Sequence, residues 1–304
     1  MAKRLVILAI AVIAPLILSL SARAQGVRWP GAVYDSDFKG KPSGPAPVHD
    51  ISGVWEPAMT ARDGVSVNGA REYPEDGNPA HEPPYTPEGL AAFQANKSGV
   101  GAHKVDSALS NDPYWRYCDP QGFPRIVLHN FRQSQIVQTA NQVLVLYMFN
   151  ERWRIIWTDG RELPKDSENP GWGTVAGIVP PAPEPRWWGY SVGKWVDDYT
   201  LVDETTGFHD GTWIDTAGRP HSDQLTVEET YHRADADHLE LSIKIIDPKY
   251  YTKPWVALDK LRLRLQSPHL DVYGAEMECS GSETQRYLEM FAGPAAEGDT
   301  GSKK

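Results

Sequence analysis

Leu239-Glu-Leu-Ser-Ile-Lys-Ile245 and Leu261-Arg-Leu-Arg-Leu265 alternate apolar and polar side chains without interruption. Successive side chains of a β-strand point to opposite faces, so each stretch buries one face and exposes the other to water. We expect a first strand at Trp55 and further strands at 134–139, 142–149, 153–157, 190–196, 200–205, 225–233, 239–246 and 256–265. The pattern therefore predicts an antiparallel meander of about nine strands, most of them joined by short turns.

Sequential hairpins favour an up-and-down β-barrel, because closure removes the open edges of a sheet. A β-sandwich is the alternative fold. Gly53 and Trp55 resemble the Gly-x-Trp signature near the start of calycin-like or lipocalin-like barrels. This resemblance implies that Trp55 closes one end of the barrel, stacked on Arg262 or Arg264.

The chain divides into a leader, an arm, one barrel domain and a tail. Lys3 and Arg4 precede an apolar stretch at 5–20 and then Ala22-Arg23-Ala24, a pattern typical of a signal peptide over residues 1–24. Residues 25–48 are rich in Gly and Pro and predict an extended arm. We expect a single barrel domain over 49–290, with an irregular excursion at 56–117 packed over one end of the sheet and a disordered tail at 291–304.

Charge and cysteine content narrow the setting and the partners. Without residues 1–24 the chain has 27 basic and 40 acidic side chains, a net charge of −13. Such a surface repels phosphate backbones and anionic lipids, so we expect no nucleic acid, no membrane span after cleavage and a small-molecule partner. Export to the periplasm or the medium predicts that the only two cysteines, Cys118 and Cys279, form a disulfide. The oligomeric state is left open.

Several motifs in order resemble a group of uncharacterised secreted bacterial proteins. The motifs are Asp159-Gly-Arg161, Trp188-Gly-Tyr-Ser-Val-Gly-Lys-Trp195, Asp203-Glu-Thr-Thr-Gly207, Gly218-Arg-Pro-His-Ser222 and Tyr251-Thr-Lys-Pro-Trp255. The resemblance covers residues 118–280 and implies no activity. Gly189-Tyr-Ser-Val-Gly193 also matches the nucleophile elbow of hydrolases, but a predicted hairpin follows Ser191 where that motif needs a helix.

The connection 207–224 concentrates titratable side chains and is the predicted site. His221 could act as a general acid or base if Asp215 or Asp223 oriented its ring. Alternatively His209, His221 and Asp215 could bind a divalent metal, although no cofactor is expected. Structural hydrogen bonding within the loop is the third interpretation.

Eight of the 11 tryptophans lie between Trp153 and Trp255, several of them in loops. Because such rings bury large areas and stack on aromatic ligands, we expect a Trp-lined barrel mouth that binds a small apolar or aromatic molecule. The predicted ligand-binding residues are Arg161, Trp188, Trp195, His209, Trp213 and Trp255. The alternative function is a lyase, isomerase or hydrolase that uses His221 and Asp215 in the same pocket, and a structural envelope protein is a third class.

Overall fold

The structure is a computed structural model that describes residues 28–39, 41–60, 68–130, 133–164, 185–270, 279–287 and 289. The predicted signal peptide, the predicted tail at 291–304, Trp172 and most of the connection before Tyr190 lie outside these residues.

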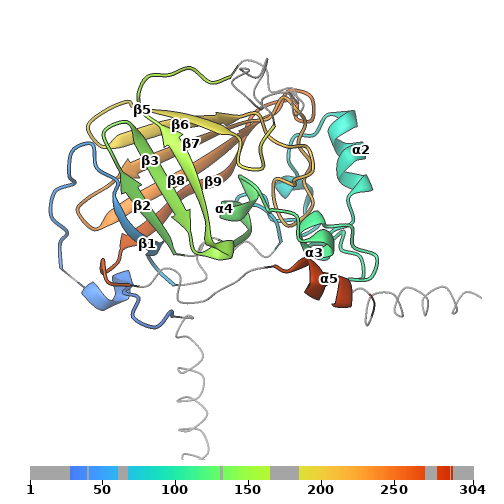
Figure 1. The fold of residues 1–304 in the computed structure, drawn as a ribbon, viewed down its shortest axis with the longest axis horizontal. Coiled ribbons are helices and arrows are strands. Elements are labelled where there is room, and N and C mark those ends of the chain that lie inside the picture. Colours follow the sequence, from blue (N-terminus) through green and yellow to red (C-terminus); the bar gives the residue numbers. More distant parts are fainter. Residues whose placement is uncertain are drawn as a thin grey trace, which may run out of the picture.

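Nine strands close into a β-barrel, as the alternation predicted (Figure 1). Each strand pairs with its neighbours in sequence, and β1 pairs with β9 to close the barrel. The barrel therefore excludes the β-sandwich. The strands are β1 (Gly53–Pro57), β2 (Ser134–Gln138), β3 (Gln142–Tyr147), β4 (Arg152–Trp157), β5 (Tyr190–Trp195), β6 (Thr200–Thr206), β7 (Thr226–Arg233), β8 (His238–Ile246) and β9 (Trp255–Leu265).

The stretches that predicted the fold line the interior of the barrel. On β8 the side chains of Leu239, Leu241, Ile243 and Ile245 are all buried, while the residues between them are partly exposed. On β9 Leu261 and Leu263 are buried and Arg262 between them is exposed, but Arg264 is also buried, and the strand shows register shifts against β8 before this part. The period of two therefore selects which residues form the core.

One strand pair departs from the predicted meander of hairpins. β4 and β5 are parallel, with Ile156 opposite Ser191 and Trp157 opposite Val192. A parallel pair needs a connection that returns along the barrel, and the long connection between Trp157 and Tyr190 allows this. The other strand pairs are antiparallel.

Trp55 closes the end of the barrel at which β1 begins and β9 ends. It is fully buried, pairs with Leu265 across the sheet and donates its indole N–H to the Ile51 carbonyl. The cation over its ring is Arg233, 4.6 Å from the ring centroid, and not Arg262 or Arg264 as expected. The expectation was wrong because Arg264 lies opposite Glu56, on the outer face of the sheet, where the side chains point away from Trp55.

The structure describes the predicted arm over 28–39 and 41–48, where it crosses the outside of the barrel. It contains a short helix, η1 (Asp35–Phe38), and the buried Tyr34. Asp35 ties it to the barrel, because its carboxylate lies 2.8 Å from His238 Nε2 and accepts from Arg264 at 3.0 Å. The segment is therefore packed, and only in part extended.

Helices gather at the side of the barrel where the excursion lies (Figure 1). They are η2 (Pro79–His81), α2 (Pro87–Ala95), α3 (Pro113–Tyr117), α4 (Arg125–Asn130), η3 (Phe149–Glu151) and α5 (Gly281–Tyr287). α2 begins with two recognised helix-start signals: Thr86 accepts from the Gly89 N–H at 3.0 Å, and Pro87 takes the first position. Within the described ranges every helix is too short or too polar to span a bilayer.

Candidate functional site

Three long connections begin and finish at the same end of the barrel, opposite Trp55. They are the excursion between β1 and β2, the connection 207–225 between β6 and β7, and the connection 247–254 between β8 and β9. We call this the capped end. The side chains of these three connections line the capped end.

The predicted site loop is buried at the capped end. Residues 212–222, which we call the plug, are all buried. Asp215 and Arg219, fully buried, form an ion pair at 2.5 Å. Burial alone would lower the pKa of Arg219, but the Asp215 carboxylate raises it. The guanidinium therefore stays charged beneath the surface.

The excursion locks the plug in place. The Asp215 carboxylate accepts from the Ala70 N–H at 2.7 Å and from the Ala217 N–H at 3.0 Å. Ser98 donates its hydroxyl to the Thr216 carbonyl at 2.6 Å, and Asn96 donates to the Gly218 carbonyl at 2.7 Å. The chain itself therefore binds the Asp215 carboxylate and two backbone carbonyls of this loop, as in the structural interpretation of the sequence.

His221 and Asp215 do not form the predicted acid–base pair. Asp215 pairs with Arg219, and the buried His221 ring lies 2.6 Å from the Thr212 hydroxyl and 3.1 Å from the Ser222 carbonyl. Burial lowers the pKa of His221, which holds the ring neutral at physiological pH. Asp223 is exposed and lies 3.9 Å from Lys249.

The predicted ligand-binding residues are divided between the two ends of the barrel. At the closed end, Trp195 is the last residue of β5 and lies near His49, and Arg161 follows the end of β4. Arg161 is bound there by its neighbour Asp159 and stacks on Trp157.

At the capped end, Trp213 and Trp255 belong to the core, with 5% and 2% of their surface exposed, and so cannot line an open mouth. His209, half-exposed, stacks on Trp187 with ring centroids 4.2 Å apart. Trp188, the remaining residue of the predicted set, is half-buried and lines a surface pocket.

We call this cavity the disulfide pocket. The pocket is small and open to solvent: about 320 Å³ of empty space lies within it and at its mouth, and the centre of a water molecule can occupy about 30 Å³ of this space. Trp188 stacks on the Tyr147 ring, 6.0 Å away. The lining residues are Tyr114, Cys118, Asp119, Pro120, Gln121, Arg152, Trp188 and Cys279.

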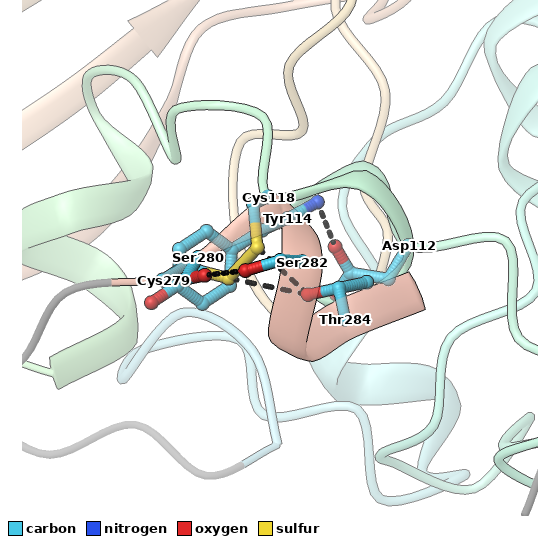
Figure 2. The surroundings of a disulfide bond; sticks show 7 residues. All are labelled: Asp112, Tyr114, Cys118, Cys279, Ser280, Ser282 and Thr284. Atoms are coloured by element: carbon cyan, nitrogen blue, oxygen red, sulfur yellow. Dashed lines mark hydrogen bonds between the residues drawn. A yellow bond between two sulfur atoms is a disulfide. The ribbon is translucent and has the colours of Figure 1, made fainter. Parts of the chain in front are cut away.

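The predicted disulfide forms one wall of the pocket. Cys118 ends α3, Cys279 directly precedes α5, and their Cα atoms are 5.5 Å apart (Figure 2). The Thr284 hydroxyl on α5 lies 2.8 Å from the Cys118 sulfur. The bond therefore fixes the C-terminal helix beside the pocket, across 161 residues of sequence.

Behind Tyr147, the barrel interior holds a buried charged group. Arg154 on β4 points inward and binds the Glu229 carboxylate, and it donates to the Ser191 and Thr205 hydroxyls at 3.0 Å each. Its guanidinium also lies 3.9 Å from the centroid of the Phe123 ring. The full set, which we call the interior cluster, is Tyr147, Arg154, Ser191, Asp203, Thr205, Glu229 and Tyr231.

The interior cluster contains one cation and two carboxyl groups. Burial raises the pKa of Asp203 well above its usual value, and the neighbouring Glu229 raises it further. A proton on Asp203 leaves Arg154 balanced by Glu229, so the interior is neutral overall. Ser191, the serine of the elbow-like motif, is a strand residue within this cluster and bonds to Thr205 at 2.8 Å.

Sequence reasoning missed Gln121, Arg152 and the interior cluster. The cluster had a detectable signal, because Arg154, Asp203 and Glu229 occupy inward positions of period-two strands, where charged residues are rare unless paired. Gln121 lies in an irregular segment and carries no comparable pattern.

A second pocket lies between the excursion and Arg219. Its walls include Glu75, Tyr85 and His103, and the His103 ring is 2.5 Å from the Glu75 carboxylate. Across the residues that the structure describes, no group of three or more His, Cys, Asp or Glu side chains could hold a metal ion.

Comparison with known proteins leaves the site to be interpreted from its own geometry. The chain matches no family model, no curated protein and no solved structure.

Proposed function

We propose that this is an exported barrel protein that binds a small apolar or aromatic molecule in the disulfide pocket. The observation that carries the proposal is the placement of Trp188, whose half-buried ring lines a cavity at the capped end. Tryptophan offers a large flat surface with few rotatable bonds, so a planar ligand can stack on it at low entropic cost. Because the pocket opens to solvent, one edge of a ligand ring can enter it while the rest of the ligand lies across its mouth against Trp188.

The surroundings of Trp188 support a rigid site. Tyr147 backs the indole ring, and its hydroxyl accepts from Arg154 Nε at 3.3 Å. Arg154 is in turn held by Glu229, Ser191 and Thr205. A wall fixed through packing and hydrogen bonds loses little freedom when a ligand binds, which favours affinity.

The disulfide supports the exported setting in the periplasm or the medium, since such bonds persist in oxidising compartments. The enzyme alternative lacks this kind of support. It required His221 beside Asp215, and both side chains are engaged by other residues of the plug.

Binding of quinoline, a neutral two-ring aromatic, tests the proposal by isothermal titration calorimetry. Trp188→Ala should weaken binding by tenfold or more, about 1.4 kcal/mol, because the stacking wall is removed. Trp153→Ala is the matched control, since that ring is 58% exposed and is not part of the pocket lining. Equal affinity in the wild type and Trp188→Ala, or no binding at all, would refute the proposed site.

A further inference from the structure

Gln121 has a buried side chain for which the described residues supply no partner. The residue is 2% exposed, and neither its amide nitrogen nor its amide oxygen has a hydrogen-bond partner among them. Buried polar groups in native proteins are nearly always hydrogen-bonded, and the exceptions call for an explanation such as a bound molecule. Because Gln121 also lines the disulfide pocket, an occupant of that pocket is the nearest source of partners.

A second buried glutamine shows how this fold normally treats such a group. Gln266 accepts from the Val33 N–H at 2.8 Å and donates to the carbonyls of Val33 and Arg264 at 2.9 and 3.1 Å. Its amide is therefore fully used in fixing the arm to the barrel. The two residues have the same chemistry and similar burial, and they differ in whether the protein completes their hydrogen bonds.

The backbone around Gln121 is held firmly. Gly122 has a positive φ of 69°, and a Cβ atom there would lie 2.6 Å from both the Thr212 side chain and the Trp187 carbonyl oxygen. The next residue, Phe123, donates its N–H to that same carbonyl at 3.0 Å. The neighbouring chain therefore fixes Gln121 next to the tryptophan pair at 187–188.

We infer that the disulfide pocket takes a planar ring bearing a cyclic amide, the ring N–H and C=O group found in lactams and nucleobases. A glutamine amide presents an N–H donor and a C=O acceptor side by side. A cyclic amide presents the reciprocal acceptor and donor, so one ligand edge satisfies both groups of Gln121. Its ring then stacks on Trp188.

The two hydrogen bonds give the site a basis for selection. A ligand of the same shape that lacks the donor leaves the Gln121 oxygen buried without a partner, and sites built around a buried polar pair reject such analogues strongly. A ligand without either group can only stack. The inference rests on the proposed function and adds the chemical class of the ligand to it.

Calorimetry with three two-ring probes separates the contribution of the hydrogen bonds to Gln121 from that of stacking on Trp188. The probes are 2-quinolone, coumarin and quinoline. Coumarin keeps the shape and the carbonyl of 2-quinolone but replaces the ring N–H by oxygen, and quinoline lacks both groups and keeps only its ring nitrogen as an acceptor. The wild type should bind 2-quinolone at least tenfold more tightly than coumarin or quinoline. Gln121→Met should reduce this preference to less than threefold, while Gln266→Met, corrected for its folded fraction, should keep it.

The outcomes distinguish the two proposals. Equal binding of all three probes by the wild type would overturn the cyclic-amide inference and leave the aromatic pocket standing. A preference that survives in Gln121→Met would also overturn it, because another residue would then supply the selection. Failure of quinoline, coumarin and 2-quinolone to bind the wild type would overturn both proposals.

Discussion

The plug and the disulfide pocket lie at the same end of the barrel, but the surroundings of two buried polar side chains, Asp215 in the plug and Gln121 in the pocket, are opposite. Asp215 in the plug receives hydrogen bonds from Ala70, Ala217 and Arg219, all from the chain itself. Gln121 in the pocket receives and donates none within the described part of the chain. A buried group that the chain satisfies stabilises the fold, whereas one left open costs free energy until something else binds it. Titratable residues close together in sequence therefore mark structure here, and the proposed site rests on an amide without a partner.

The largest effect is expected in the plug. Asp215→Ala leaves the Arg219 guanidinium buried without its counter-charge, so the free energy of unfolding should fall by about 3–5 kcal/mol. Asp223→Ala, in the same loop but at an exposed side chain, should change it by less than about 0.5 kcal/mol. Urea denaturation of both variants measures the difference. Similar small costs would show that the plug is a tolerant surface loop.

The interior cluster predicts a dependence of stability on pH. The pKa of Asp203 is raised in the folded state above its ordinary value of 3.8. Above pH 3.8 the Asp203 carboxyl of the unfolded protein therefore releases its proton, while that of the folded protein keeps it. Stability due to this group is therefore lost as the pH rises from about 4 toward the folded pKa.

Asp203→Asn, which cannot ionise, should remove this loss. The free energy of unfolding of the variant relative to the wild type should increase with pH, by up to about 1.4 kcal/mol per pH unit. Asp210→Asn, at a carboxylate whose side chain is 91% exposed, is the control and should follow the wild type. Parallel curves for Asp203→Asn and the wild type between pH 4.5 and 7.5 would mean that Asp203 is ionised in the folded protein.

The two buried glutamines give a matched test of the comparison. Gln266→Met leaves the Val33 backbone without its partners and should cost about 1–3 kcal/mol. Gln121→Met removes an amide that has no hydrogen-bond partner among the described residues. The free energy of unfolding of the unliganded protein should therefore fall by less than about 0.5 kcal/mol or increase. Thermal unfolding of both variants checks this. A cost at Gln121 equal to that at Gln266 would mean that the Gln121 amide contributes to folding.

A smaller effect is expected at His221. Its folded pKa lies below the usual 6.5, so unfolded protein takes up a proton that the folded protein does not, and stability is lost as the pH falls below about 6.5. His221→Gln should flatten this decline by no more than about 1.4 kcal/mol per pH unit. His269→Gln, at an exposed ring, should leave it unchanged. An unaltered decline in His221→Gln would place the proton uptake elsewhere.

The strands were predictable because alternation alone decides which side chains face the interior, as Leu239 to Ile245 show. The disulfide followed from the cysteine count and the expected export. The parallel pairing of β4 with β5 was not predictable, because it depends on the path of a long connection.

The site was harder to predict because sequence proximity does not fix partners. Asp215 was predicted beside His221, but it accepts from Arg219 four residues away and from Ala70 across 145 residues. Likewise Trp188 and Trp195 appear in one motif, yet the strand β5 carries them to opposite ends of the barrel. Gln121 could be recognised only once its surroundings were known.

The most direct test of the central claim is a nuclear magnetic resonance titration of isotope-labelled protein with 2-quinolone. The side-chain amide signals of Gln121 and Gln266 and the indole signals of Trp188 and Trp213 can be assigned from single substitutions. We predict that the signals of Gln121 and Trp188 shift with added ligand, while those of Gln266 and Trp213 stay in place. Shifts at Trp213 without shifts at Gln121, or no shift at any of the four, would contradict the assignment of binding to the disulfide pocket.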